Sequence, residues 1–353
     1  MSKQNIIILC GGQSAEHEVS LMSAKSIVKF IPKDLYQPIP IGISKEGRWL
    51  AGENFFENED DPKNICLGQN LREVELKDGY IDNKKVDLVF PILHGTFGED
   101  GCMQGVLEIA KIAYVGSGVM GSAIGMDKDI MKRLVSPEGI LCAKHIAFYK
   151  YQNKIPNYDE VKNKLGDTVF VKPCCQGSSI GISKCVNKSQ YDEAVKLAFR
   201  YDYKVLVEEY VKGREIEVSV LGHHEVSASL PGEIIPTEDF YSYNAKYISS
   251  DDTELKVPAE LDEKTKSDIQ NQAIKVFRLL ELSGMARVDF FLKETGEIYF
   301  NEVNTLPGFT SISMYAKLWE VSGIKYPELI HQLIKIGQSR FSDIKALERD
   351  VEI

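Results

Sequence analysis

The chain has 353 residues, and its 42 Lys and Arg against 52 Asp and Glu leave a formal net charge of −10. With 43% hydrophobic and 27% charged residues, the composition is that of a soluble globular protein of roughly two or three domains, which excludes collagen-like, disulfide-scaffold and wholly disordered chains. The acidic balance argues against a general nucleic-acid binder, because such proteins carry a basic surface. Any anionic ligand must therefore be met by cations placed locally.

The cysteines and the N-terminus indicate a compartment. The seven cysteines are scattered without the spacing of a metal site, and the adjacent Cys174 and Cys175 are too close for an ordinary disulfide, so we expect reduced thiols. The apolar run at residues 6–10 is too short for a signal-peptide core, and no later stretch has the length of a membrane span. We therefore expect a cytoplasmic protein that binds neither membranes nor nucleic acids.

The first third of the chain alternates predicted strands and helices. In chain order these elements are a strand at 5–10, a helix at 19–30, strands at 39–43 and 86–93, and a helix over about 103–112. Such alternation indicates an α/β unit with a largely parallel sheet over about residues 1–120.

Two further units are predicted, over about residues 121–211 and 212–353. A short helix capped by Asp127 must end near Ser136 and Pro137. The later predicted elements are a strand at 168–172, a helix at 189–200, a strand at 205–211, further strands from Glu215, a helix over about 260–283, two short strands and a helix near 327–339. Residues 237–258 show no sustained period, and an irregular segment of this length is typical of a functional loop.

The most informative segment is a predicted hairpin. Two alternating runs flank the turn Glu294-Thr-Gly-Glu297, which carries Gly where a hairpin turn needs it. If the first residue of this turn faces the last, then Asp289 faces Glu302 and Arg287 faces Asn304. Because residues two apart share a face of a strand, these four side chains come together.

This polar cluster suits a metal ion. Asp289, Glu302 and Asn304 would converge as oxygen ligands, the kind that Mg²⁺ prefers in combination with substrate phosphates. The bland alternative is a solvated polar face. It is weakened because apolar residues at 288, 290 and 292 fill the other face of the first strand.

Two other segments suit a nucleotide. Backbone N–H groups of the glycine-rich loop at 172–182 can cradle phosphate and Lys172 adds charge, although many loops with two glycines are only turns. The strand at 205–211 carries Glu208 and Glu209, and acids accept hydrogen bonds from an adenine amine or ribose hydroxyls. Alone, a strand with two acids is more typical of a sheet edge with solvated side chains.

Taken together, the chain resembles the D-alanine–D-alanine ligases of the ATP-grasp superfamily, over about residues 4–340. The resemblance rests on seven motifs in colinear order: 11–20 (GGQSAEHEVS), 94–101 (HGTFGEDG), 126–128 (MDK), 172–181 (KPCCQGSSIG), 243–247 (YNAKY), 287–289 (RVD) and 301–308 (NEVNTLPG). It implies an α/β (α+β overall) ATP-grasp architecture. An N-terminal Rossmann-like domain over 1–120 would precede two α+β subdomains, over 121–211 and 212–353, that grip ATP.

The resemblance also implies a reaction. In this family the carboxylate of one D-alanine attacks the γ-phosphate of ATP, giving ADP and D-alanyl phosphate. The amine of a second D-alanine then displaces phosphate, and the dipeptide is a precursor of peptidoglycan. ATP as co-substrate and two Mg²⁺ ions, with Mn²⁺ as an alternative, are the implied cofactors, and the family is usually homodimeric.

For the nucleotide, the resemblance implies roles residue by residue. Phosphate contacts would come from Lys128, Lys172 and Lys246, although an exposed helix lysine is the bland alternative for Lys128. Adenine and ribose contacts would come from Glu208 and Glu215, with backbone groups around Glu209 and Val211 completing the base site. The implied Mg²⁺ ligands are Asp289, Glu302 and Asn304, in agreement with the hairpin pattern.

For the amino acids, the resemblance assigns Glu16 to the ammonium of the first D-alanine; the alternative is an acid favoured at a helix start. Ser178 and Tyr247 would complete a bonded triad with Glu16 that closes the 237–258 loop. Arg287 and the backbone N–H of Gly308 would hold the oxyanion of the tetrahedral adduct.

Ser313, with the backbone of Met314, would receive the second carboxylate, unless Ser313 is an ordinary helix cap. Two histidines are less defined. His94 either orients substrate or bonds to its own loop, and His17 is expected at the surface. Cys174 and Cys175 depart from the family pattern and leave side-chain contacts there open.

Three other functions stay open. Tyr247 weighs against a D-Ala–D-lactate ligase, whereas a D-Ala–D-Ser ligase is harder to exclude. Another ATP-grasp enzyme, of the biotin carboxylase or glutathione synthase type, should lack Glu16, Ser178 and Tyr247 as a set. A non-enzymatic nucleotide-binding module would not require the full charge-handling set.

Overall fold

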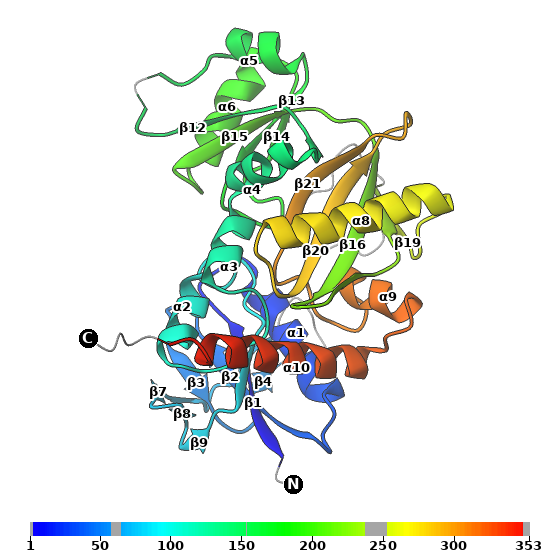
Figure 1. Ribbon diagram of the computed structural model, residues 1–353. Helices are drawn as coiled ribbons and strands as arrows, with labels where there is room; N and C mark the ends of the chain where they lie inside the picture. The colour runs from blue at the N-terminus through cyan, green and yellow to red at the C-terminus, as the bar shows by residue number, and fades with distance from the viewer. Residues whose placement is uncertain (1–2, 58–64, 153, 237–252, 349–353) are drawn as a thin grey trace, which may run out of the picture.

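Three main β-sheets lie one after another along the molecule in the computed structural model (Figure 1). The structure describes residues 3–57, 65–152, 154–236 and 253–348. Lys246, Tyr247 and most of the predicted 237–258 loop lie outside these residues. No helix within the described ranges is long and apolar enough to cross a membrane.

The N-terminal sheet has the predicted parallel centre. Strand β1 (Gln4–Gly11) pairs in parallel with β10 (Leu88–Pro91) and with β2 (Tyr36–Ile43). Alternate residues of β1 enter two cores: Ile6 and Ile8 face one core, and Ile7 and Leu9 face the other. This two-sided burial explains why the strand is a continuous apolar run. Helices α1 (His17–Phe30), α2 (Cys102–Ile109) and α3 (Val119–Met126) accompany this sheet.

An insertion of short strands, absent from our prediction, extends this unit. Strands β3 (Trp49–Ala51) and β6 (Arg72–Glu73) add antiparallel to the sheet edge. The remaining strands form a two-stranded pair and a three-stranded meander: β4 (Phe56–Glu57), β5 (Cys66–Leu67), β7 (Leu76–Lys77), β8 (Tyr80–Ile81) and β9 (Lys84–Lys85). The insertion carries none of the predicted site residues.

The middle of the chain forms a four-stranded antiparallel sheet in the order β12-β15-β13-β14. Its strands are β12 (His145–Tyr149), β13 (Val169–Pro173), β14 (Ser183–Cys185) and β15 (Lys204–Glu209). Helices α5 (Tyr158–Leu165) and α6 (Lys188–Ala198) pack on the face that carries Val171 and Val207. Because side chains alternate along a strand, Lys172 and Glu208 lie on the opposite face.

Helix α4 (Lys128–Val135) precedes that sheet and confirms the predicted cap. The Asp127 side chain accepts hydrogen bonds from the backbone N–H groups of Asp129 and Ile130. The helix ends where predicted, at the short 3-10 turn η1 (Ser136–Glu138).

The largest sheet combines β11 (Leu141–Cys142) with the C-terminal strands, in the order β11-β21-β20-β16-β18-β19, and β17 pairs with β16. Its other strands are β16 (Arg214–Gly222), β17 (Val226–Ala228), β18 (Gly232–Pro236), β19 (Thr253–Lys256), β20 (Gly284–Leu292) and β21 (Ile298–Asn304). Strand β19 corrects our prediction that residues 237–258 are irregular throughout.

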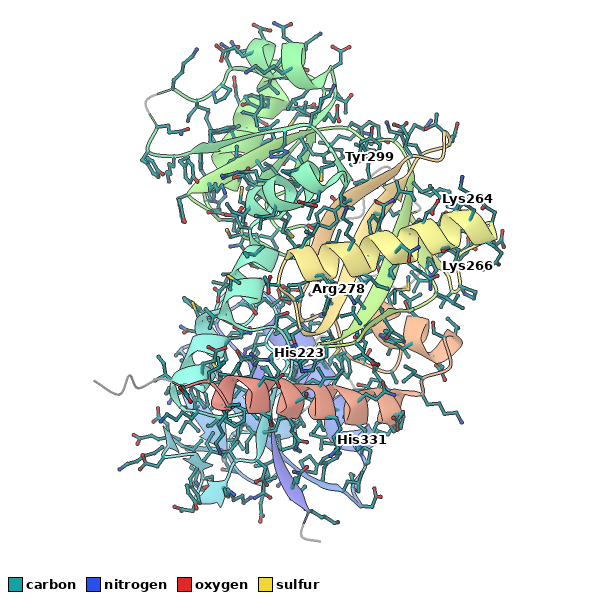
Figure 2. The ribbon with its side chains drawn as sticks, viewed as in Figure 1. His223, Lys264, Lys266, Arg278, Tyr299 and His331 are labelled. Carbon is teal, nitrogen blue, oxygen red and sulfur yellow. The ribbon has the colours of Figure 1, made fainter. Side chains whose placement is uncertain are left out.

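Helix α8 (Glu263–Leu279) covers one face of the largest sheet. Ile269 and Phe277 point into the core, whereas Lys264 and Arg278 are exposed on the outer face of the helix (Figure 2). The polar residues of β16, β20 and β21 therefore lie on the sheet face opposite α8.

The last helix returns to the N-terminal unit. Helix α10 (Tyr326–Lys345) follows α9 (Met314–Val321), which we did not predict, and lies across the N-terminal unit in Figure 1. Leu329, Leu333 and Ile334 of α10 share a core with Ile6 and Ile8 of β1. The two ends of the chain thus build one hydrophobic core. The division of the chain into units near residues 120 and 212 stays a prediction.

Candidate functional site

The predicted hairpin forms with the predicted partners at its polar end. Arg287 pairs with Asn304 and Asp289 pairs with Glu302, as the sequence indicates. The assumption that Glu294 faces Glu297 at the turn was wrong. Lys293 faces Glu297 instead, and the backbone N–H of Lys293 donates to the Glu297 carbonyl at 3.0 Å.

A β-bulge reconciles the two ends of the hairpin. Phe290 pairs with Phe300 while Asp289 pairs with Glu302, so Asn301 is an extra residue on β21. Phe300 and Val303 are consequently both buried although they are three residues apart. The bulge shifts the pairing by one residue, which places Glu302 on the polar face with Asp289.

Three carboxylates lie side by side across three strands of this face. Glu217 of β16 pairs with Asp289, which pairs with Glu302. Arg287 stabilises this row: its Nε and Nη2 donate to the two Asp289 oxygens at 2.8 Å each, and Nη2 lies 3.1 Å from Glu217 Oε1. Our sequence prediction missed Glu217. The available signal was its position two residues after Glu215, on the same strand face.

The donor set fits the predicted metal. Adjacent carboxylates repel one another, so a row of acids is stable only beside cations. Asp289 and Glu302 are paired across neighbouring strands, and Asn304 Oδ1 lies on the same face, where it accepts a hydrogen bond from the Leu306 N–H at 3.1 Å. Carboxylate and amide oxygens are the ligands of Mg²⁺, and these three residues are the ones that would hold it.

Lys128 joins this row to the glycine-rich loop. Its ammonium donates to the Gln176 carbonyl at 2.7 Å and lies 3.2 Å from Glu302 Oε2. Burial lowers the pKa of Lys128, but the Glu302 carboxylate and other nearby groups together outweigh burial, and the net shift is upward. The bland alternative of an exposed helix lysine is wrong, because only 6% of Lys128 is exposed.

Glu208 lies between two lysines. Its two oxygens are 2.9 Å from Lys132 Nζ and 2.6 Å from Lys172 Nζ. Strand β15 lies between β12 and β13, and Glu208 is buried, so the alternative of a solvated edge acid is wrong. Burial raises the pKa of this carboxyl, but the two lysines outweigh it and lower the pKa to about 2.

Lys132 is the main residue that sequence reasoning missed. It is 1% exposed, and besides Glu208 it contacts the bulge, donating to the Asn301 carbonyl at 2.9 Å. Lys132 therefore links the four-stranded sheet to the hairpin. Its spacing of four residues from Lys128, which puts both lysines on one face of α4, was the available signal.

The lowered pKa of Glu208 predicts a pH dependence of stability. Because the folded-state pKa is about 2 and the ordinary value 4.5, this carboxylate stabilises the fold above pH 4.5, and the stabilisation is lost as the pH falls toward 2. The whole contribution is about 3 kcal/mol. We expect Glu208→Gln to be less stable than wild type near neutral pH, and the difference to shrink in acid.

Urea unfolding at neutral pH and at about pH 3 measures this difference. Glu294→Gln, which changes an exposed acid of the hairpin turn, is the matched control and should follow wild type. A difference between wild type and Glu208→Gln that stays constant with pH would contradict the assignment.

Glu16 and Ser178, predicted members of one triad, are in contact. The Ser178 hydroxyl donates to Glu16 Oε1, although the two residues belong to different units. Glu16 Oε2 lies against two glycines: an added Cβ would be 3.1 Å from it at Gly95 and 3.3 Å at Gly177. The carboxylate is thus held between two glycine turns. Tyr247, the third member, lies outside the described residues.

His94 fixes the segment that carries Gly308. Its Nδ1 donates to the Leu306 carbonyl at 2.8 Å, and its Nε2 lies 3.3 Å from Ser23 Oγ, which accepts the Phe309 N–H at 3.2 Å. Burial would lower the pKa of His94, but nearby Glu99 and other groups outweigh it and raise the pKa. His94 therefore connects its own loop, where Nδ1 lies 3.8 Å from Glu99 Oε1, to the segment before Gly308.

His17 contradicts our expectation of a surface position. His17 is 6% exposed, and its Nδ1 lies 2.8 Å from the Gly12 carbonyl, so the side chain stabilises the glycine turn that precedes α1. The sequence carried no sign of this burial, because it depends on the close approach of the Gly11 turn to the His17 ring.

Gly308 and Ser313 are adjacent. A Cβ on Gly308 would lie 3.4 Å from Ser313 Oγ. Ser313 occupies the position before α9 without capping it, and its hydroxyl accepts the Thr310 N–H at 3.0 Å. The ordinary-cap alternative is therefore wrong.

The remaining predicted residues cluster where β15 leads into β16. Glu209 Oε1 accepts the Lys144 N–H at 2.9 Å, Val211 is buried, and Glu215 pairs with Phe291 on β20. All seven cysteines are free, as expected. Burial raises the pKa of Cys175, beside the glycine-rich loop, to about 12, so it is a thiol at neutral pH.

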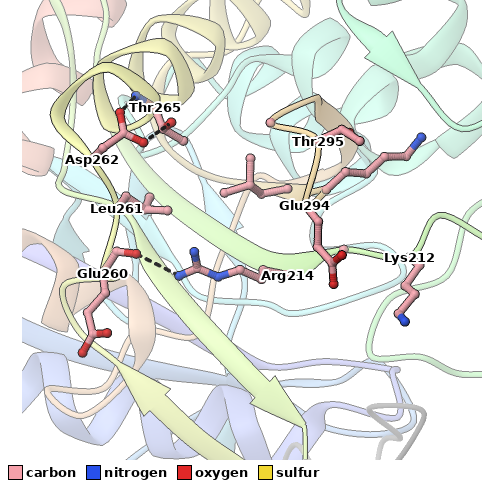
Figure 3. A pocket seen from close by; sticks show the side chains of 12 residues that line it. Lys212, Arg214, Glu260, Leu261, Asp262, Thr265, Glu294 and Thr295 are labelled. Atoms are coloured by element: carbon pink, nitrogen blue, oxygen red, sulfur yellow. Dashed lines mark hydrogen bonds between the residues drawn. The ribbon is translucent and has the colours of Figure 1, made fainter.

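A separate hollow of about 850 Å³ lies on the C-terminal unit (Figure 3). Its lining includes Lys212, Arg214, Asp262 and Glu294, and none of the predicted site residues. Arg214 is held there by Glu233 and by the Glu260 carbonyl. We therefore do not assign the proposed chemistry of the polar face to this hollow.

Comparison with known proteins places this geometry in a family. The model for the D-ala D-ala ligase N-terminus matches residues 5–117, and that for the D-ala D-ala ligase C-terminus matches residues 134–335. The chain belongs to the D-alanine–D-alanine ligase family. A ligase of this name from Oceanobacillus iheyensis is 47% identical over 351 residues, covering 96% of each chain.

Solved structures agree with the family. The D-alanine–D-alanine ligase from Coxiella burnetii superposes with a TM-score of 0.84 at 34% identity, covering 97% of each chain. The VanG D-Ala:D-Ser ligase from Enterococcus faecalis gives 0.83 at 36% identity, covering 95% of this chain and all of that one. The mixed α/β fold of the chain thus matches that of ligases with the ATP-grasp architecture, as predicted. Membership of this family excludes the biotin carboxylase and glutathione synthase types.

Proposed function

We propose that the chain ligates two D-alanine molecules at the expense of ATP, through a D-alanyl phosphate, and so supplies a precursor of peptidoglycan. The observation that carries the proposal is the hairpin register. Arg287 and Asp289 face Asn304 and Glu302, which gathers a cation and oxygen donors on one polar face.

The first half-reaction brings two anions together. The carboxylate oxygen of the first D-alanine attacks the γ-phosphorus, the bond to the β,γ-bridging oxygen breaks, and ADP leaves. Glu16 would hold the ammonium of this D-alanine, since a buried carboxylate is a strong acceptor for it. Its contact with Ser178 would place the substrate beside the glycine-rich loop.

Cations offset the repulsion between carboxylate and triphosphate. Lys128 and Lys172 would contact the α- and β-phosphates, and Lys246 the γ-phosphate. Mg²⁺, or Mn²⁺ in its place, would neutralise phosphate charge and align the reacting groups when held by the hairpin ligands. Lys128 lies beside Glu302, so the phosphate and metal sites would be contiguous.

The second half-reaction consumes the acyl phosphate. The amine of the second D-alanine adds to the carbonyl carbon, the bond to the phosphate oxygen breaks, and the amine loses a proton. Arg287 and the Gly308 N–H would stabilise the oxyanion, while Ser313 would receive the second carboxylate. The His94–Leu306 hydrogen bond supports this assignment, because it anchors the segment before Gly308.

The choice of second substrate is tested directly by acceptor competition. A structure similar to this chain is named a D-Ala:D-Ser ligase, so D-Ser is the specific alternative acceptor. We expect ADP release with D-alanine alone and D-alanyl-D-alanine as the product, even when D-Ser or D-lactate is added. Mass spectrometry identifies the products, and a mixed product dominated by D-Ser would replace the proposed acceptor.

Tyr247→Phe tests the loop residue that the family pattern links to an amine acceptor. Loss of the hydroxyl should open the triad with Glu16 and Ser178 and shift the acceptor preference toward D-lactate. The ratio of depsipeptide to dipeptide, measured with both acceptors present, reports the shift. Tyr151→Phe, which changes an exposed tyrosine with no proposed role, is the control. An unchanged ratio in Tyr247→Phe would refute this role.

Cytoplasmic location and a homodimer are further parts of the proposal. They rest on the family and on the composition, and gel filtration with light scattering would measure the assembly.

A further inference from the structure

We propose that His223, His224 and Asp343 form a binding site for a divalent transition-metal ion, with Zn²⁺ as the best match. The two histidines follow β16 in the turn to β17, and Asp343 lies near the end of α10. Figure 2 shows His223 between the end of the largest sheet and α10, the helix that carries Asp343. The proposed site is distinct from the polar face of the hairpin.

The ligand atoms already converge. His223 Nε2 lies 3.1 Å and His224 Nε2 lies 2.8 Å from the same Asp343 oxygen, Oδ2, and all three atoms are within 4.8 Å of one another. Zn²⁺ binds His nitrogen and carboxylate oxygen at about 2.0–2.2 Å in a tetrahedron, which sets its ligands about 3.4 Å apart. The two nitrogen–oxygen distances are a few tenths of an ångström shorter than this, so small outward shifts of the rings from Asp343 Oδ2 bring these pairs to the spacing that the ion needs.

A second hydrogen bond orients one of the ligands. His223 Nδ1 lies 3.1 Å from Ser283 Oγ, which leaves Nε2 directed at Asp343. Ser283 is itself anchored, because its backbone N–H donates to Ser117 Oγ at 3.1 Å. Metal-binding histidines usually bond through their other nitrogen in this way, and the partner fixes the ring orientation.

The chemistry of the ligands separates this ion from Mg²⁺. Two imidazoles and one carboxylate suit Zn²⁺ and its neighbours, whereas Mg²⁺ prefers oxygen ligands alone. The side chain of His224 is 67% exposed and that of Asp343 48%, so an ion can reach the cluster from solvent. Three protein ligands leave a fourth position for water.

The bound ion would connect two parts of the chain. The turn with the two histidines follows β16, the strand that carries Glu215 and Glu217. Helix α10 packs in the core of the N-terminal unit. A cross-link here stabilises the folded chain in proportion to the occupancy of the ion, because an ion that binds only the native state raises the free energy of unfolding.

The test uses the full-length chain, stripped of metal and then held in excess Mg²⁺ so that oxygen-ligand sites are filled. Zn²⁺ is titrated against a chromophoric chelator, and Co²⁺ is added separately to read its tetrahedral absorption bands. We expect one tight Zn²⁺ per chain and a rise in Tm on its addition. Asp343→Asn and His224→Gln should lose this binding, and Ser283→Ala should weaken it by about 10–100-fold.

Two matched controls exclude general binding to histidines or acids. Glu225→Gln removes a neighbouring exposed acid, and His145→Gln breaks a His–Asp pair that has only one histidine, His145 Nε2 being 3.4 Å from Asp129 Oδ1. Both should bind Zn²⁺ like wild type. Equal Zn²⁺ affinity in wild type, Asp343→Asn and His224→Gln would overturn the proposal, and so would a tetrahedral Co²⁺ spectrum that survives both substitutions.

Discussion

Arg287→Ala should reduce the rate of dipeptide formation by about 10²–10³-fold, the usual cost of removing one oxyanion donor. The reason is twofold. Arg287 binds Glu217 and Asp289 of the acidic row, and its removal takes this positive charge away from two neighbouring carboxylates. It is also the proposed donor to the tetrahedral adduct. The rate of product formation at saturating ATP and D-alanine measures the loss.

Arg214→Ala is the matched control. Arg214 also binds a carboxylate through two nitrogens, at 2.8 and 2.7 Å from Glu233, on the same sheet but away from the proposed chemistry. It should keep near-wild-type turnover. Arg287→Lys should rescue little activity, because an ammonium cannot reproduce the two-pronged contact with Asp289. Near-wild-type turnover of Arg287→Ala, with an unchanged Tm, would refute the role of Arg287.

Lys132→Met should destabilise the fold by about 3–5 kcal/mol, the usual cost of removing one partner from a buried ion pair. Glu208 would keep Lys172 but lose the lysine that also contacts the Asn301 carbonyl. We also expect a higher KM for ATP, because Lys132 connects the two sheets proposed to grip the nucleotide. Urea unfolding and steady-state kinetics measure the two effects.

Lys275→Met is the control for this substitution. Lys275 also donates to a backbone carbonyl, that of Glu138, but it is exposed. The control should lose less than about 1 kcal/mol, as is usual for surface substitutions. If Lys132→Met were as stable as Lys275→Met, then Lys132 would not be the link between the two sheets.

The hairpin shows how far a sequence pattern extends. Alternation alone predicted that Asp289 faces Glu302, and this is confirmed, yet the turn closes one residue earlier than we assumed. The extra residue at Asn301 has no local signal. Its carbonyl is satisfied by Lys132, about 170 residues earlier in the chain, so the bulge depends on tertiary contacts.

Other features were within reach of the sequence. The turn Asp78-Gly79 joins β7 to β8, and both of its residues have positive φ, as a two-residue hairpin requires. Asp82 and Asn83 join β8 to β9 and also both have positive φ. We overlooked these strands because two residues are too few to show alternation. The burial of Glu208 was beyond prediction, since both neutralising lysines come from other elements.

The central claim, ligation through D-alanyl phosphate, is tested most directly by isotope transfer. D-alanine labelled with ¹⁸O in its carboxylate is incubated with ATP, and the released phosphate is analysed by mass spectrometry. The carboxylate oxygen that attacks phosphorus stays with it when the amine displaces phosphate, so each dipeptide formed should yield one ¹⁸O-labelled phosphate. Dipeptide formed with unlabelled phosphate would contradict the account.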